Sequence, residues 1–99
     1  MNLTHDLADN VLTFHLEGEL NSYNSEEVEK QLDSIIQAST FNAIRMDMDK
    51  LVYISSAGLR IIVRLKQMYD DLALINVDDS VYSIFEMVGF NSILKIERK

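Results

Sequence analysis

Short apolar runs alternate with amphipathic segments along almost the whole chain, and this alternation restricts the folds that it can adopt. Residues 3–20 contain two short runs separated by Asp9 and Asn10, and the second run alternates polar with apolar side chains. That pattern predicts an antiparallel hairpin. Helical and extended segments then follow in turn, an order that right-handed crossovers convert into a mainly parallel sheet. The sequence therefore predicts an α/β fold with an opening hairpin.

The first two helices are predicted by apolar residues that recur every three or four positions. The first helix begins after Asn24 or Ser25, either of which can serve as its N-cap, and the second runs from the two serines at positions 55 and 56 to about residue 70. The recurring positions are Val28, Leu32, Ile35 and Ile36 in the first helix and Leu59, Ile62, Leu65 and Tyr69 in the second. We assign Leu59, Ile62 and Leu65 to the core.

The rest of the chain supplies three further strands and one helix. The strands are expected over residues 43–48, 72–77 and 93–97. We expect the first of them to end in a turn at Asp49 and Lys50, followed by a brief extended piece through Ile54. The second is a continuous apolar run, of the kind buried in a sheet that helices cover. Between the last two strands, a helix begins at a capping acid or serine and ends at Gly89.

Composition excludes several functional classes. Nine basic against sixteen acidic residues give a net charge of −7, which argues against binding nucleic acid or an anionic membrane surface. Without cysteine there is no disulfide, no thiol nucleophile and no thiolate zinc site. No apolar run approaches the ~20 residues that cross a bilayer, and the N-terminus resembles no signal peptide. We expect a single cytoplasmic domain over residues 1–99.

Two adjacent serines, Ser55 and Ser56, lie between an extended segment and a helix, and catalysis does not explain them. A serine nucleophile needs a base within hydrogen-bond distance. The histidines, His5 and His15, both belong to the opening hairpin, and the alternation places His15 on the solvated face of its strand. The segment also lacks the glycine that precedes the nucleophile in hydrolases. The sequence therefore provides no mechanism for an enzyme.

Metal and nucleotide sites are also disfavoured. Asp47 and Asp49 point the same way on an extended chain and suggest a divalent ion, but no third ligand is near in sequence, and acids at strand ends are more often solvated or capping. The three glycines are scattered singly, so no glycine-rich phosphate loop exists. We predict neither a metal nor a cofactor.

Capping explains one of the two hydroxyl groups. Ser55 or Ser56 can accept a hydrogen bond from a first-turn amide that would otherwise lack a partner. The other hydroxyl would then lie at the positive end of the helix, where a phosphate finds favourable charge. Local chemistry favours the plain cap over a phosphorylation switch, and the two readings are compatible.

The whole chain resembles a STAS domain of the bacterial anti-sigma factor antagonists. The resemblance is carried by "LEGELN" after the hairpin, "MDMDKLVYISSAGLR" in the middle and "VYSIFEMVGFNSILKI" at the end. It implies a STAS fold, in which an opening β-hairpin is followed by a mainly parallel mixed sheet of four to six strands packed with three or four helices. It also implies a binding protein without enzymatic activity.

The resemblance implies a cycle of partner switching. In this family, a partner that is both anti-sigma factor and serine kinase phosphorylates a serine at the start of the second helix. The unmodified antagonist binds that partner, which releases the sigma factor to direct transcription, and phosphorylation abolishes the binding. A phosphatase of the PP2C type restores the active form. The ATP belongs to the kinase, so the resemblance implies no cofactor for this chain.

Alignment on Gly58 transfers the family's site to this sequence. Ser55 takes the place of the family's aspartate, Ser56 that of the first hydroxyl, and Ala57 that of the second, which is the phosphosite in some members. Ser56 is therefore the expected phosphosite, with Ser55 second. Asn21 stands where many members have an aspartate after "GEL". The expected partner-binding residues are Asn21, Ser55, Ser56, Ala57, Gly58, Arg60 and Arg64.

Arg60 and Arg64 are included among the expected partner-binding residues because of their charge and spacing, and not because of the alignment. They lie four residues apart on the predicted helix, with Gln67 continuing the stripe, so they can meet an acidic patch on the kinase or hold the phosphate itself. A solvated helix face without a partner is the plain alternative. For the whole protein, the alternative is a STAS scaffold without phosphorylation, for example a subunit of a lipid-transport or signalling complex.

Overall fold

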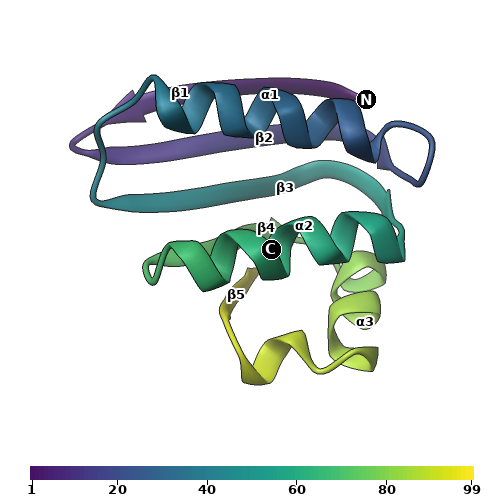
Figure 1. Cartoon of the computed structure of the whole chain (residues 1–99). Helices are drawn as coiled ribbons and strands as arrows, with labels where there is room; N and C mark the ends of the chain where they lie inside the picture. Colours follow the sequence, from purple (N-terminus) through teal and green to yellow (C-terminus); the bar gives the residue numbers. More distant parts are fainter.

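Five strands lie side by side in chain order, from β1 at one edge of the sheet to β5 at the other (Figure 1). The computed structural model describes all 99 residues. Its elements are β1 (Asn2–Ala8), β2 (Val11–Leu20), α1 (Ser25–Gln37), β3 (Ala43–Ile54), α2 (Ser56–Met68), β4 (Leu72–Val77), α3 (Asp79–Met87), a 3₁₀ turn (Phe90–Ser92) and β5 (Lys95–Arg98). β1 pairs antiparallel with β2, and all other neighbours are parallel. The predicted mixed α/β sheet with an opening hairpin is confirmed.

The hairpin turn forms at the predicted pair of residues. Asp9 and Asn10 have φ angles of 52° and 63° and join Ala8 to its antiparallel partner Val11. This left-handed conformation suits a two-residue hairpin turn, and asparagine and aspartate tolerate it better than other residues with a side chain.

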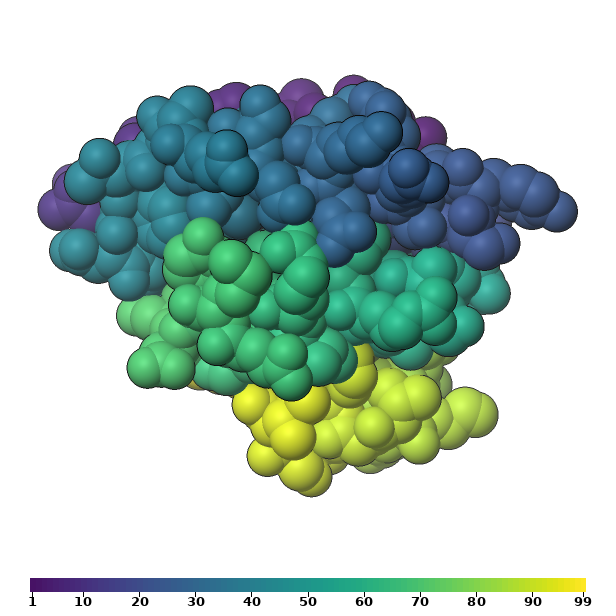
Figure 2. Space-filling view, in the orientation of Figure 1, coloured from purple at the N-terminus to yellow at the C-terminus, as the bar shows by residue number.

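One face of the sheet packs against the helices. Leu12, Phe14 and Leu16 of β2 are buried, as the predicted alternation requires, and α1 and α2 lie next to each other over this face (Figures 1 and 2). The core residues of the two helices are Val28, Leu32, Ile36, Ile61, Ile62 and Leu65. Ile61 was not predicted, whereas Leu59 is only partly buried because it lies at the edge of the apolar stripe.

The predicted turn at Asp49 and Lys50 is wrong. β3 continues through both residues to Ile54 and stays paired with β2 to its end. The pairing advances by two residues on β2 from His15 to Glu17 but by three on β3, so a β-bulge absorbs the extra residue. A charged pair that resembles a turn in sequence is thus accommodated inside a long strand.

The third helix closes the end of the core beside β3. Phe85 of α3 stacks on Phe90 of the following 3₁₀ turn, with ring centroids 5.7 Å apart. Gly89 links the two with φ of 79°, which confirms the predicted glycine at the end of this helix. None of the three α-helices combines the length and the apolar composition that crossing a bilayer would require.

Candidate functional site

The two serines and Asn21 lie at the same end of the sheet, because they follow the carboxyl ends of the parallel strands β2 and β3. β2 and β3 end next to each other, with Leu20 paired to Ile54, and the backbone N–H of Ser55 donates to the carbonyl of Leu20 at 2.8 Å. The turn from β2 into α1 therefore lies beside the start of α2. Residues that are more than thirty positions apart in sequence form one surface at the carboxyl ends of these strands.

Ser55 is the cap of α2. Its backbone is extended, with φ of −90° and ψ of 172°, and its Oγ accepts a hydrogen bond from the amide of Gly58 at 3.3 Å. Its carbonyl accepts the first hydrogen bond of the helix, from the amide of Leu59. The prediction that one serine of the pair caps the helix is confirmed, and the cap is Ser55.

Ser56 has a different environment. It is the first residue of α2, its side chain is exposed, and its hydroxyl makes no hydrogen bond within the protein. First-turn amides of a helix have no acceptor inside it. Of those in α2, only the amide of Gly58 is satisfied by a side chain. Ser56 thus combines a free hydroxyl with a location where negative charge is favourable.

Gly58 is buried at the point where α2 lies closest to the sheet. A β-carbon at this position would lie 2.7 Å from Cγ1 of Ile54 and 2.8 Å from Cγ of Leu20. Both distances are shorter than van der Waals contact, so only glycine fits without movement of its neighbours. Gly58 therefore allows the close approach of α2 to β2 and β3. The adjacent Ala57 is half-buried.

Asn21 organises the turn between β2 and α1. Its Oδ1 accepts hydrogen bonds from the amides of Tyr23 and Asn24, at 2.9 and 3.1 Å. Asn24 returns the contact, because its Oδ1 accepts from the amide of Asn21 and its Nδ2 donates to the carbonyl of Glu19. Asn24 is the N-cap residue, as predicted, but its side chain makes no capping hydrogen bond. The amide side chain of Asn21 thus supplies the oxygen acceptor of an Asx turn, in which the amide two residues later is the donor.

The two arginines of α2 differ in their contacts. Arg64 donates to Glu29 and Asp33 of α1, with its Nε 2.6 Å from Oε2 of Glu29 and its Nη2 2.7 Å from Oδ1 of Asp33. These contacts, with Asp33 contributing most, raise the pKa of Arg64. Arg60 is exposed and has neither an ion pair nor a hydrogen bond. The predicted stripe therefore divides into one arginine that joins two helices and one that is free.

A groove separates the N-terminal halves of α1 and α2. It has a volume of about 320 Å³ and is lined by Ser25, Glu26, Glu29, Ala57, Arg60, Ile61 and Arg64. Glu29 is paired with Arg64, and Glu26 has Lys30 at 3.7 Å. Arg60 is thus the free cation of a groove that begins beside the two serines.

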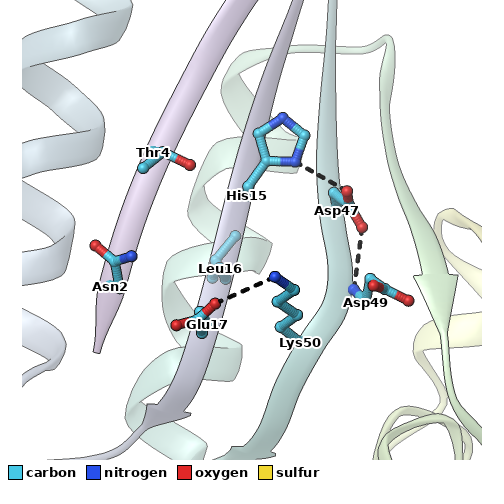
Figure 3. A pocket seen from close by; sticks show the side chains of 8 residues that line it. All are labelled: Asn2, Thr4, His15, Leu16, Glu17, Asp47, Asp49 and Lys50. Carbon is cyan, nitrogen blue, oxygen red and sulfur yellow. Dashed lines mark hydrogen bonds and ion pairs between the residues drawn. The ribbon is translucent and has the colours of Figure 1, made fainter.

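A second polar cluster lies on the opposite, open face of the sheet, where His15 of β2 is paired with Asp47 of β3 (Figure 3). The ring of His15 bridges two carboxylates: its Nε2 is 2.8 Å from Oδ2 of Asp6 on β1, and its Nδ1 is 2.9 Å from Oδ2 of Asp47 on β3. The solvated strand face predicted for His15 is confirmed, since 41% of its side chain is exposed, and the structure adds the two carboxylate contacts that the sequence did not predict. A cavity of about 270 Å³ lies beside it, between β1 and the bulge of β3.

This cluster shifts the pKa values of its members. Hydrogen bonds to Asp6 and then to Asp47 raise the pKa of His15 above 6.5. Burial opposes ionisation of Asp47, but hydrogen bonds from Asn76, from the amide of Asp49 and from His15 outweigh it and lower the pKa of this carboxyl. Asp49 pairs with Lys99 at 3.1 Å. The carboxylates of Asp47 and Asp49 thus contact protein donors, and no group of three or more His, Asp or Glu side chains in the structure has an arrangement that could hold a metal ion.

Comparison with known proteins gives consistent matches over nearly the whole chain. Residues 3–99 match the STAS domain family. BtrV of Bordetella bronchiseptica, provisionally assigned as an anti-sigma factor antagonist, is 35% identical over 97% of this chain and 85% of its own. The anti-sigma-B factor antagonist of Listeria monocytogenes is 27% identical over 81% of this chain and 73% of its own.

Among solved structures, SpoIIAA, a cell fate determinant of Bacillus, has the same fold in two chemical states. The unphosphorylated form superposes with a TM-score of 0.78 at 15% identity, covering 96% of this chain and 87% of SpoIIAA. The phosphorylated form superposes with a TM-score of 0.69 at 14% identity, covering 96% and 90%.

Proposed function

Because the chain belongs to the STAS domain family, we propose that it is an anti-sigma factor antagonist, which binds an anti-sigma factor and so releases the sigma factor that this partner holds. The names of the two sequence relatives support this role. The chain acts by binding and not by turnover, in the cytoplasm. Its partner is also a serine kinase, and a phosphatase of the PP2C type reverses the modification.

The regulated residue is Ser56, and one observation carries this assignment. Ser56 is exposed with a free hydroxyl, whereas its neighbour Ser55 is half-buried and occupied as the cap of α2. A phosphate on Ser56 therefore changes the surface without removing a contact of the fold. It brings a charge of about −1.5 to −2 to a docking surface, which is enough to exclude a partner that fits the neutral form. That SpoIIAA is known in both chemical states supports the view that this fold can accommodate such a change.

The docking surface surrounds Ser56. It comprises the turn organised by Asn21, the start of α2 with Ala57, and the exposed Arg60. Gly58 contributes by holding the helix close to the sheet, and Ser55 by capping it. Arg64 contributes by fixing α1 against α2, so that the groove between them keeps its shape.

A binding experiment with three variants tests this proposal. The anti-sigma factor kinases encoded in the same genome are purified, and the affinity of each for the wild type, Ser56→Ala, Ser56→Asp and Ser34→Asp is measured by calorimetry. Ser34 is an exposed serine of α1 and controls for added charge. We expect one kinase to bind the wild type, Ser56→Ala and Ser34→Asp alike, and to lose at least tenfold in affinity for Ser56→Asp.

Incubation of that kinase with ATP and the chain, followed by mass spectrometry, then locates the phosphate. Phosphate on Ser56 of the wild type and none on Ser56→Ala is the expected result. Full affinity for Ser56→Asp, or modification at a different residue, would refute the switch at Ser56. Indifference of every partner to position 56 would instead favour the constitutive scaffold.

A further inference from the structure

The free arginine of the α1–α2 groove lies one helical turn after Ser56. Residues four apart in an α-helix lie above one another on the same face, and Ser56 and Arg60 have this spacing within α2. Helical side chains also lean toward the N-terminus of their helix, so the guanidinium of Arg60 is directed back toward position 56. An acid that precedes a base by four residues is the more favourable order of such a pair.

We propose that Arg60 binds the phosphate of phosphorylated Ser56 within the same chain. This inference rests on the proposed function for the phosphate itself. It adds that the modification changes two features of the docking surface together, because it introduces a dianion at position 56 and withdraws the free cation at position 60. A partner that binds the guanidinium of Arg60 in the unmodified form therefore loses this contact when Arg60 binds the phosphate.

The other charged groups of the groove leave this role to Arg60. Arg64 is held by Glu29 and Asp33, and both of these contacts would have to break before it could turn toward position 56. Glu26 and Glu29 also line the groove and would repel a phosphate. Since Glu29 already has a basic partner and Glu26 has one nearby, the uncompensated positive charge in the groove is that of Arg60.

Arginine is well suited to this contact. Its planar guanidinium can donate two parallel hydrogen bonds to phosphate oxygens. In the unmodified chain Arg60 makes no hydrogen bond or ion pair that would have to be broken, so the main cost of forming the pair is ordering of the side chain. Substitution of Arg60 is also expected to leave the fold intact, because its side chain is exposed.

Phosphorus NMR on full-length chains with genetically encoded phosphoserine at position 56 tests the proposal without any kinase. The phosphate resonance is titrated with pH in the wild type, Arg60→Gln, Arg60→Lys and the control Lys66→Gln. Lys66 lies on the same helix but donates to the carbonyl of Asp70. We expect Arg60→Gln to raise the phosphate pKa by about 0.3 to 0.5, the size of effect that an exposed ion pair produces. Arg60→Lys should retain part of the wild-type value, and Lys66→Gln all of it.

Phosphoserine at position 55 provides the test of geometry. Position 55 is five residues from Arg60 and does not share its helix face, so Arg60→Gln should shift the phosphate pKa there by less than half as much. The proposal is overturned if Arg60→Gln leaves the titration at position 56 unchanged, or if the shifts at 55 and 56 are equal. Because the phosphate is placed chemically, this result does not depend on whether a kinase modifies Ser56 in the cell.

Discussion

Nδ1 of His15 lies 2.9 Å from Oδ2 of Asp47, across the parallel register that pairs these residues on β2 and β3. The other ring nitrogen faces Asp6 at 2.8 Å. A neutral imidazole has one N–H and can donate to only one of these carboxylates. Both contacts are hydrogen bonds only when the ring carries two protons, so this arrangement of three strands selects the imidazolium form.

The first prediction concerns the pH dependence of stability. Because the pKa of His15 is raised in the folded state above its ordinary 6.5, the stabilisation by the charged ring is complete below that pH and is lost as the pH rises through the raised value. We expect the free energy of unfolding in urea to fall by about 0.5 kcal/mol across this window, since the cluster is partly exposed. His15→Gln should abolish this fall. His5→Gln, which removes the other histidine, should preserve it, and an equal loss in both variants would contradict the assignment.

The second prediction concerns Gly58. Replacement by alanine inserts a methyl group where Leu20 and Ile54 leave no space, and we expect a loss of stability of about 1–3 kcal/mol despite the better helix propensity of alanine. Urea denaturation measures it. In a double-mutant cycle, Leu20→Ala should cost less in the Gly58→Ala background than in the wild type, because it vacates the space that the methyl group needs. Additive costs would show that the clash with Leu20 is not the cause of the lost stability.

The third prediction compares the ion pairs that join α2 to α1 with an ion pair inside α1. Arg64→Gln breaks two hydrogen-bonded ion pairs between α1 and α2, and we expect it to cost about 1 kcal/mol, toward the upper end for partly exposed pairs. Lys30→Gln is the control, because Lys30 lies 3.7 Å from Glu26 on the same helix and both side chains are exposed. If the two substitutions have equal effects on urea unfolding, Arg64 does not join the helices.

The fourth prediction assigns different tasks to the adjacent serines. Ser55→Ala removes the cap of α2 and should lower the free energy of unfolding by about 1 kcal/mol. Ser56→Ala removes no contact and should change it by less than about 0.5 kcal/mol. Thermal or urea unfolding of the two variants gives the comparison. The reverse order would make Ser56 the cap and leave Ser55 as the free hydroxyl.

Local signals in the sequence predict the order of elements, the hairpin turn and the apolar faces of the strands. They fail at Asp49 and Lys50, where a charged pair resembles a turn, because a bulge in a paired strand has no distinctive composition. Whether such a pair bends the chain depends on the neighbouring strand. Since β2 is long enough to continue the pairing, β3 stays extended to Ile54.

The candidate site shows the same difference between contacts that are local in sequence and contacts that depend on the packed structure. The cap at the serines is a contact within four residues, so the sequence predicts it. The contacts of Arg64 with α1 and of His15 with β1 and β3 depend on how helices pack and on strand register. Nothing near Arg64 in the sequence distinguishes it from Arg60, and only the packed structure shows that one arginine is engaged and the other is free.

The division between Ser55 and Ser56 also bears on how such a site can change over generations. Since the hydroxyl at position 56 contributes no contact to the fold, its loss or gain by mutation carries little penalty in folding. Under the proposed function, descendants of this chain can therefore acquire or discard regulation at that position without an intermediate that fails to fold. The cap at Ser55, by contrast, contributes to the stability of α2 whether or not position 56 is regulated.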